Sequence, residues 1–147
     1  MIAVIQRTLG AKVKVNSKII SKIEQGMVVL LGIQKGDTIN DAHYVAKKIS
    51  SLRIFNDEHN KMNRSIKEVN GSALVISQFT LCANIKKGNR PSFIHAEDSK
   101  PSRDLYDYFI EIIIRNGVTV KTGEFGAMMD VELVNNGPST FIVESKN

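Results

Sequence analysis

The chain has 147 residues, 42% of them hydrophobic, which is enough to bury one core without metals or disulfides. Lysine and arginine number 20 against 15 acidic residues, so the formal net charge is +5 and the sequence pI is about 9.4. This excess of positive charge favours a polyanion such as RNA as a partner, although the cations are dispersed along the chain.

Three features of the sequence bear on its compartment. Cys82 is the only cysteine, so no intramolecular disulfide can form. Residues 1–7 have no basic segment ahead of an apolar run, which a secretion signal requires. The longest apolar run, residues 27–31, is far shorter than the roughly 20 residues of a membrane span. We expect a single domain over residues 1–147, located in the cytoplasm and not in a membrane.

The first third of the chain predicts strands. Residues 12–15 alternate lysine with valine, which is typical of a strand with one face in the core. Residues 2–6 and 19–24 have a similar pattern. Residues 27–33 are apolar nearly throughout, which predicts a strand covered on both faces.

Two amphipathic helices follow. Residues 38–41 have the form of a capping box, and behind it Ile39, Ala42, Val45, Ile49 and Leu52 recur at helical spacing. The second helix begins near Ser99 and Pro101 and ends at residues 116–117, where glycine can adopt a left-handed cap. Its apolar stripe consists of Leu105, Tyr108, Phe109, Ile112 and Ile113.

Further strands are predicted at residues 73–79, 118–122, 130–134 and 140–143, so the fold class is α+β. A polar stretch between Leu81 and Ser99 is too long for a minimal connection. It contains Asn84, Lys86, Lys87, Gly88, Asn89, Arg90 and Pro91. Such a stretch either serves a site or is a solvated surface excursion.

Two short segments carry more information. Residues 77–81, Ser-Gln-Phe-Thr-Leu, end an apolar strand with polar groups, where functional side chains often emerge from a sheet. Residues 136–140, Asn-Gly-Pro-Ser-Thr, lie between two predicted strands, where Gly-Pro ordinarily marks a turn.

Together these segments resemble the paired signatures of the D-aminoacyl-tRNA deacylase family. The resemblance extends to residues 1–7, 53–55, 61–63, 90–93 and 105–109, and so covers essentially the whole chain. Ser139 departs from it, because bacterial members commonly have valine there. The resemblance implies stacked β-sheets covered by a helical layer, similar to the editing domain of archaeal threonyl-tRNA synthetases.

The implied activity is hydrolysis of the ester between tRNA and a D-amino acid. Glycyl-tRNA mischarged on alanine tRNA is an implied substrate, and L-aminoacyl-tRNA is implied to be rejected. The family acts as a homodimer, in which Gly137 and Pro138 of each subunit would enter the partner's pocket. Their peptide bond would be cis, which would point both carbonyls the same way and leave no space for an L side chain.

Thr80 is the best side-chain candidate for the chemistry, but a threonine nucleophile needs a neighbouring base and none is evident. In the family's other account, a 2′-hydroxyl of the terminal adenosine assists water, and Phe79 and Thr80 supply backbone N–H donors. Ser77 and Gln78 would hold the adenosine or shape the pocket.

The remaining implied roles concern the pocket wall and the Gly-Pro segment. Arg7 would brace that segment, which includes Asn136, and Met129 would line the wall unless it simply packs in the core. We interpret His43, His59 and His95 as solvated and Cys82 as a small apolar residue. We expect no metal and no cofactor.

Three rival readings remain. One is the related animal deacylase with a trans Gly-Pro bond, whose strand motif differs. The second is a catalytically silent RNA-binding module, and the third is a hydrolase that uses Cys82.

Overall fold

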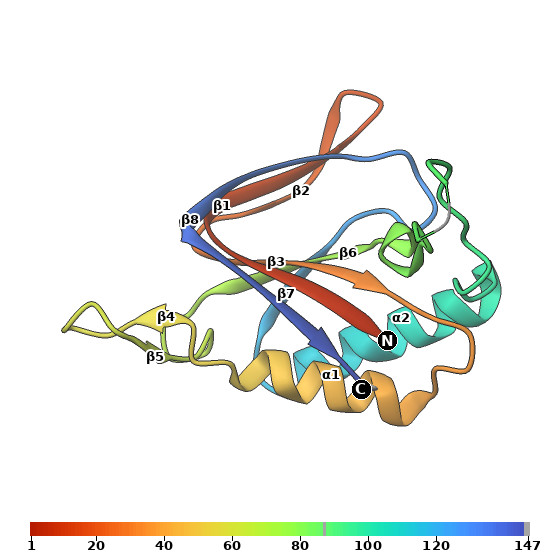
Figure 1. Ribbon diagram of the computed structural model, residues 1–147. Coiled ribbons are helices and arrows are strands. Elements are labelled where there is room, and N and C mark those ends of the chain that lie inside the picture. The colour runs from red at the N-terminus through yellow and green to blue at the C-terminus, as the bar shows by residue number, and fades with distance from the viewer. Residues whose placement is uncertain (87, 146–147) are drawn as a thin grey trace.

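The structure, a computed structural model, describes residues 1–86 and 88–145. These residues form a six-stranded mixed sheet, a two-stranded hairpin and two α-helices (Figure 1). Lys87, which belongs to the polar stretch, lies outside the described residues. The strands are β1 (Ile2–Val15), β2 (Lys18–Ile23), β3 (Gly26–Gly32), β4 (Phe55–Asn56), β5 (Met62–Arg64), β6 (Ser72–Ser77), β7 (Thr119–Thr122) and β8 (Asp130–Glu144).

The sheet has the order β2-β1-β3-β6-β7, and β8 pairs with the other edge of β1. β3 and β7 run parallel to β6, whereas β1 is antiparallel to each of its partners. β1 and β8 are paired from Ile2 with Glu144 to Lys14 with Asp130, so the two longest strands form one extended ribbon.

This ribbon curls over the rest of the sheet (Figure 1). Along β3, Val29 and Leu31 face the cluster that the helices cover, whereas Val28 belongs to a second cluster with Val13 and Leu74. Both faces of β3 are therefore buried, as the apolar run predicted. The α+β class is confirmed, and the main sheet of the described residues curls toward a barrel.

Helix α1 (Ile39–Ser51) begins at the predicted capping box, in which the backbone N–H of Thr38 donates to Asp41 Oδ2 at 2.7 Å. Val45 and Ile49 are fully buried. Ile39, which we expected on the same apolar stripe, is the first residue of the helix and is 56% exposed.

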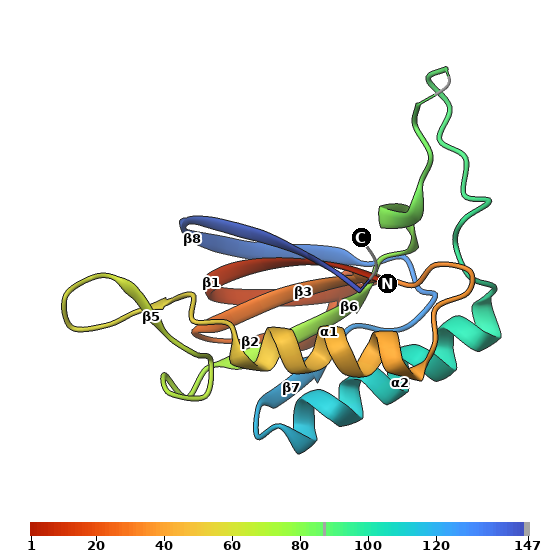
Figure 2. The same ribbon diagram turned by 60° about the horizontal axis from the view of Figure 1, so that its bottom comes forward.

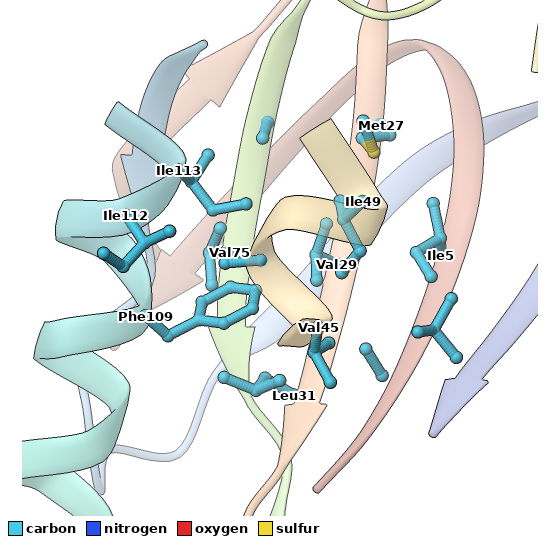
Figure 3. Packing of buried hydrophobic residues seen from close by; sticks show 14 of the residues in the cluster. Ile5, Met27, Val29, Leu31, Val45, Ile49, Val75, Phe109, Ile112 and Ile113 are labelled. Atoms are coloured by element: carbon cyan, nitrogen blue, oxygen red, sulfur yellow. The ribbon is translucent and has the colours of Figure 1, made fainter. Parts of the chain in front are cut away.

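Helix α2 (Ser99–Arg115) covers the same face of the sheet as α1, as Figure 2 shows. Phe109, Ile112 and Ile113 pack toward Val75 and α1 (Figure 3). Tyr106, which was not on the predicted stripe, is also buried. The helix ends with Gly117 at φ +84°, in agreement with the predicted left-handed cap.

Two predictions about strands were wrong. β6 ends at Ser77, and Phe79–Cys82 form a short 3₁₀ helix, η1, instead of continuing the strand. The runs 130–134 and 140–143 are parts of the single strand β8, because the Gly-Pro segment bulges outward and does not reverse the chain. No helix in the described ranges is long and apolar enough to cross a membrane.

Candidate active site

The carboxyl end of β6 places a row of polar groups beside a cavity. Ser77 pairs with Leu31 of β3, and the next backbone N–H, that of Gln78, donates to the Leu31 carbonyl at 2.8 Å. Gln78 then precedes the 3₁₀ turn, which leaves Phe79 and Thr80 exposed. The last strand hydrogen bond thus fixes where the polar segment leaves the sheet.

The cavity has a volume of about 680 Å³. It is lined by Ile76, Ser77, Gln78, Phe79, Thr80, Ala96, Glu97, Ser99, Ser102, Phe125, Gly126, Ala127, Met128, Met129 and Val131. Five of the nine predicted site residues are among them, namely Ser77, Gln78, Phe79, Thr80 and Met129. The tertiary structure therefore joins the strand motif to a loop about fifty residues later in the chain.

The hydroxyl of Thr80 has a neutral neighbour. The Nε2 of Gln78 donates a hydrogen bond to Thr80 Oγ1. A side-chain amide is no base at neutral pH, so this contact orients the hydroxyl without activating it as a nucleophile.

Cys82 and the three histidines are not among the residues that line the cavity. Cys82 is 3% exposed and its thiol donates to the Ile33 carbonyl at 3.4 Å. Burial, with a smaller contribution from the nearby Asp37 carboxylate, raises the pKa of the Cys82 thiol, which disfavours the reactive thiolate. His43, His59 and His95 are exposed and do not line the cavity. Within the described ranges, no three His, Cys, Asp or Glu side chains are grouped as a metal site.

The opposite wall comes from the loop before β8, which sequence reasoning largely missed. Phe125 lies beside Tyr106, with ring centroids 5.5 Å apart, and the Arg103 guanidinium lies 5.4 Å from the same ring. The hydroxyl of Tyr106 donates to the Val75 carbonyl at 2.8 Å, and burial raises its pKa. Met129 lines the cavity and also packs against the second core cluster.

Met128, beside Met129 in the sequence, is 91% exposed at the cavity. The sequence signal for this wall is an apolar side chain, Met128, in a loop that also contains Gly126. No sequence signal placed Glu97, Ser99 and Ser102 at the cavity. They lie before and in the first turns of α2, where polar residues are typical of helix capping and of a solvated face.

Arg7 is 6% exposed and its guanidinium reaches three neutral oxygens. Its Nε donates to the Asn136 carbonyl at 3.0 Å, and its Nη1 donates to the Ile54 carbonyl and to Asn56 Oδ1, each at 2.8 Å. This buried arginine joins the middle of β1 to β8 and to the start of the β4–β5 hairpin.

The Gly-Pro segment is a bulge in β8. Gln6 pairs with Thr140 and Thr8 pairs with Asn135, so residues 136–139 stand opposite Arg7 alone. Gly137 has φ +134°, which suits glycine, and its peptide bond to Pro138 is cis, in agreement with the family resemblance. Gly137 and Pro138 are both exposed.

Within one chain, the bulge lies far from the cavity. In the strand register, Ser77 pairs with Leu31, which pairs with Ala3. Arg7 pairs with Met27 and is therefore offset from Ser77 by four residues along the strands. That offset is about 13 Å, and the three strand spacings from β6 to β8 add about 14 Å across the sheet. Accordingly, none of Arg7, Asn136, Gly137 and Pro138 lines the cavity.

Known proteins are similar to this chain over nearly its whole length. The family profile described as D-Tyr-tRNA(Tyr) deacylase matches residues 4–144. A protein of Desulfatibacillum aliphaticivorans named D-aminoacyl-tRNA deacylase is 51% identical over 146 residues, which cover 99% of this chain and 100% of the relative. A protein of Bacillus cytotoxicus with the same name is also 51% identical, with the same coverage.

Two solved structures share the fold. One, titled c-Myc DNA Unwinding Element Binding Protein, has a TM-score of 0.94 and 38% sequence identity, and the match covers 100% of both chains. The other, titled as a probable eukaryotic D-amino acid tRNA deacylase, has a TM-score of 0.83 over 97% of this chain and 98% of that chain. At 17% identity, it supports the fold alone.

Proposed function

The chain belongs to the D-Tyr-tRNA(Tyr) deacylase family and is a D-aminoacyl-tRNA deacylase, and we propose that it cleaves its ester in the cavity at the end of β6. The observation that carries this placement is the convergence of Ser77, Gln78, Phe79 and Thr80 on one cavity. The remaining steps concern how the ester is attacked and how the L form is rejected.

Water is the proposed nucleophile. Its oxygen bonds to the ester carbonyl carbon, the carbonyl oxygen becomes an oxyanion, and the bond to the 3′-oxygen of the tRNA then breaks as that oxygen takes up a proton. The first N–H groups of a helical turn have no acceptor within that turn, and Phe79 and Thr80 occupy these positions in η1. Aimed at the oxyanion, each such donor would contribute about 3 kcal/mol to transition-state stabilisation.

The proton transfer is assigned to the 2′-hydroxyl of the terminal adenosine, because no basic side chain is hydrogen-bonded to Thr80 within the described residues, and the carboxylate that lines the cavity, Glu97, accepts the Asp98 N–H at 2.9 Å. The partner of the Thr80 hydroxyl is the Gln78 amide, and the histidines and Cys82 lie outside the cavity. Ser77 and Gln78 are then positioning residues that hold the adenosine.

Chiral selection is assigned to a second copy of the chain. Gly137 and Pro138 are exposed and lie too far from their own cavity to contact a substrate there. The face of the β1–β8 ribbon turned away from the helices is uncovered, since Ile142, which pairs with Val4, is 66% exposed. A homodimer formed on this ribbon would bring each bulge to the partner's cavity.

Rigid backbone is well suited to this rejection. Specificity of this kind is best obtained from a clash with the wrong substrate. The Gly137 and Pro138 carbonyls, held by Arg7, would face the alpha carbon and exclude an L side chain. Glycine has no side chain and would pass, so glycyl-tRNA is a proposed second substrate.

The test is hydrolysis of D-tyrosyl-tRNA, L-tyrosyl-tRNA and glycyl-tRNA by the purified chain. Loss of the D and glycyl esters alone supports the proposal. Equal loss of the D and L esters would remove the Gly-Pro bulge from the mechanism. Binding of tRNA without turnover of any ester would instead favour the silent nucleic-acid-binding module.

A further inference from the structure

We propose that residues 84–86 and 88–92, called the basic finger below, bind the phosphate backbone of the tRNA acceptor end. This inference rests on the proposed function, because it specifies how the same cavity holds its substrate. It assigns a role to the polar stretch that the sequence left open between a functional loop and a solvated excursion.

The basic finger has a closed base. The backbone N–H of Asn84 donates to the Ser92 carbonyl at 2.7 Å, and the N–H of Ser92 donates back to the Asn84 carbonyl at 3.0 Å. Figure 2 shows the green segment beyond η1 standing away from the sheet and both helices.

The root of the finger is fixed to the cavity. Phe93, which follows the finger, lies against Phe79 with ring centroids 5.0 Å apart in an edge-to-face arrangement. Two residues later, the His95 carbonyl accepts a hydrogen bond from the Lys35 N–H at 2.9 Å. Since Phe79 and Ala96 line the cavity, the finger has a defined position relative to the reacting ester.

The charge of the finger is one-sided. Its exposed cations include Lys86 and Arg90, and the segment contains no acidic residue. Some other exposed cations do face carboxylates, as in the pairs of Lys100 with Asp104 and of Arg115 with Glu111. Within residues 1–86 and 88–145, neither Lys86 nor Arg90 forms such a pair, so both remain available to an external anion.

A nucleic acid strand fits this surface. Phosphates recur every few ångströms along a strand, so Lys86 and Arg90 can each meet one of them. Arginine can grip a phosphate with two parallel hydrogen bonds, and lysine acts as a point charge. Because the 3′ end must enter the cavity, the strand leading out of it passes the root of the finger.

The experiment compares the double variant Lys86→Gln/Arg90→Gln with Lys47→Gln/Lys48→Gln. The latter removes the same charge from the exposed face of α1. Both variants and the wild type are assayed on D-tyrosyl-tRNA between 50 and 200 mM KCl, a range of about fourfold in which phosphate contacts change affinity strongly. D-tyrosyl-adenosine, which carries no phosphate, serves as the second substrate.

For the finger variant, we expect KM for D-tyrosyl-tRNA to rise roughly tenfold with kcat unchanged. The slope of log KM against log salt should fall by about 1.5, and hydrolysis of D-tyrosyl-adenosine should be unchanged. An equal rise in KM for the α1 variant would overturn the inference, as would an equal loss on D-tyrosyl-adenosine. Failure of the wild type on both substrates would instead overturn the proposed function.

Discussion

The Nε of Arg7 donates a hydrogen bond to the carbonyl oxygen of Asn136, 3.0 Å away and 129 residues later in the chain. This contact anchors the four-residue bulge of β8 to the strand that faces it. Because the other two acceptors of Arg7 lie at the start of the β4–β5 hairpin, the arginine holds three segments in one arrangement.

Replacement of Arg7 should affect both stability and selectivity. Arg7→Ala leaves the buried Ile54 carbonyl without its donor and should lower the free energy of unfolding by about 3 kcal/mol. Arg7→Lys keeps the charge but not the planar fork, so it should lose less stability and still hydrolyse L-tyrosyl-tRNA measurably. Arg115→Lys, an exposed control whose ion pair with Glu111 a lysine can keep, should change neither quantity. Wild-type selectivity in Arg7→Lys would contradict the bracing role.

Gly137→Ala should displace the bulge. A Cβ on Gly137 would clash with Ser139 Oγ and lie 3.1 Å from Arg7 Nη2, at a φ of +134° that side chains rarely adopt. We expect a loss of discrimination between D- and L-tyrosyl-tRNA, with the far-ultraviolet circular dichroism unchanged. Gly10→Ala is the matched control, because its Cβ would meet only the Ile23 carbonyl at 3.7 Å.

Two buried serines should respond in opposite directions. Ser139 Oγ has no hydrogen-bond partner among the described residues, so Ser139→Ala should raise the free energy of unfolding by about 1 kcal/mol. Ser50 Oγ donates to the Ala46 carbonyl at 2.8 Å, so Ser50→Ala should lower it by about 1 kcal/mol. Urea denaturation measures both. Equal losses for the two variants would mean that the Ser139 hydroxyl has a partner, for which the second subunit is the first place to look.

Thr80→Ala separates positioning from nucleophilic attack. Loss of a true nucleophile costs about a millionfold in kcat, whereas loss of an orienting hydroxyl should cost less than about a hundredfold. We expect the smaller effect in single-turnover hydrolysis of D-tyrosyl-tRNA, and near wild-type rates for Thr80→Ser. A millionfold loss would restore Thr80 as the attacking group.

Cys82→Ala should retain activity, since the thiol is buried outside the cavity. It should also alter the pH dependence of stability. The folded chain raises the pKa of this thiol, so its favourable contribution is complete below the unfolded pKa of about 8.5 and is lost as the pH rises through the folded value. The stability of the wild type relative to the variant should therefore fall above pH 8.5, measured by urea denaturation. An abolished activity would revive the cysteine hydrolase.

The sequence alone was sufficient for the local features of the fold. Helix α1 begins at the capping box of Thr38, and helix α2 ends before Gly117, as expected. Both signals act within one turn of the chain. The apolar run after Gly26 identified a strand buried on two faces, and the motif at Ser77 identified the polar rim of the cavity.

Only the tertiary structure decided what these segments meet. The curl of the β1–β8 ribbon depends on pairing between residues more than a hundred positions apart, and no local pattern encodes it. The loop at Phe125 forms the second wall because Tyr106 and Arg103 of α2 hold its ring. From the sequence, the Gly-Pro segment was interpreted as a turn. It forms a bulge because strand β1, with Arg7, lies opposite it in the folded chain. Long-range register, set by burial of both faces of β3, therefore separates the bulge from the cavity of its own chain.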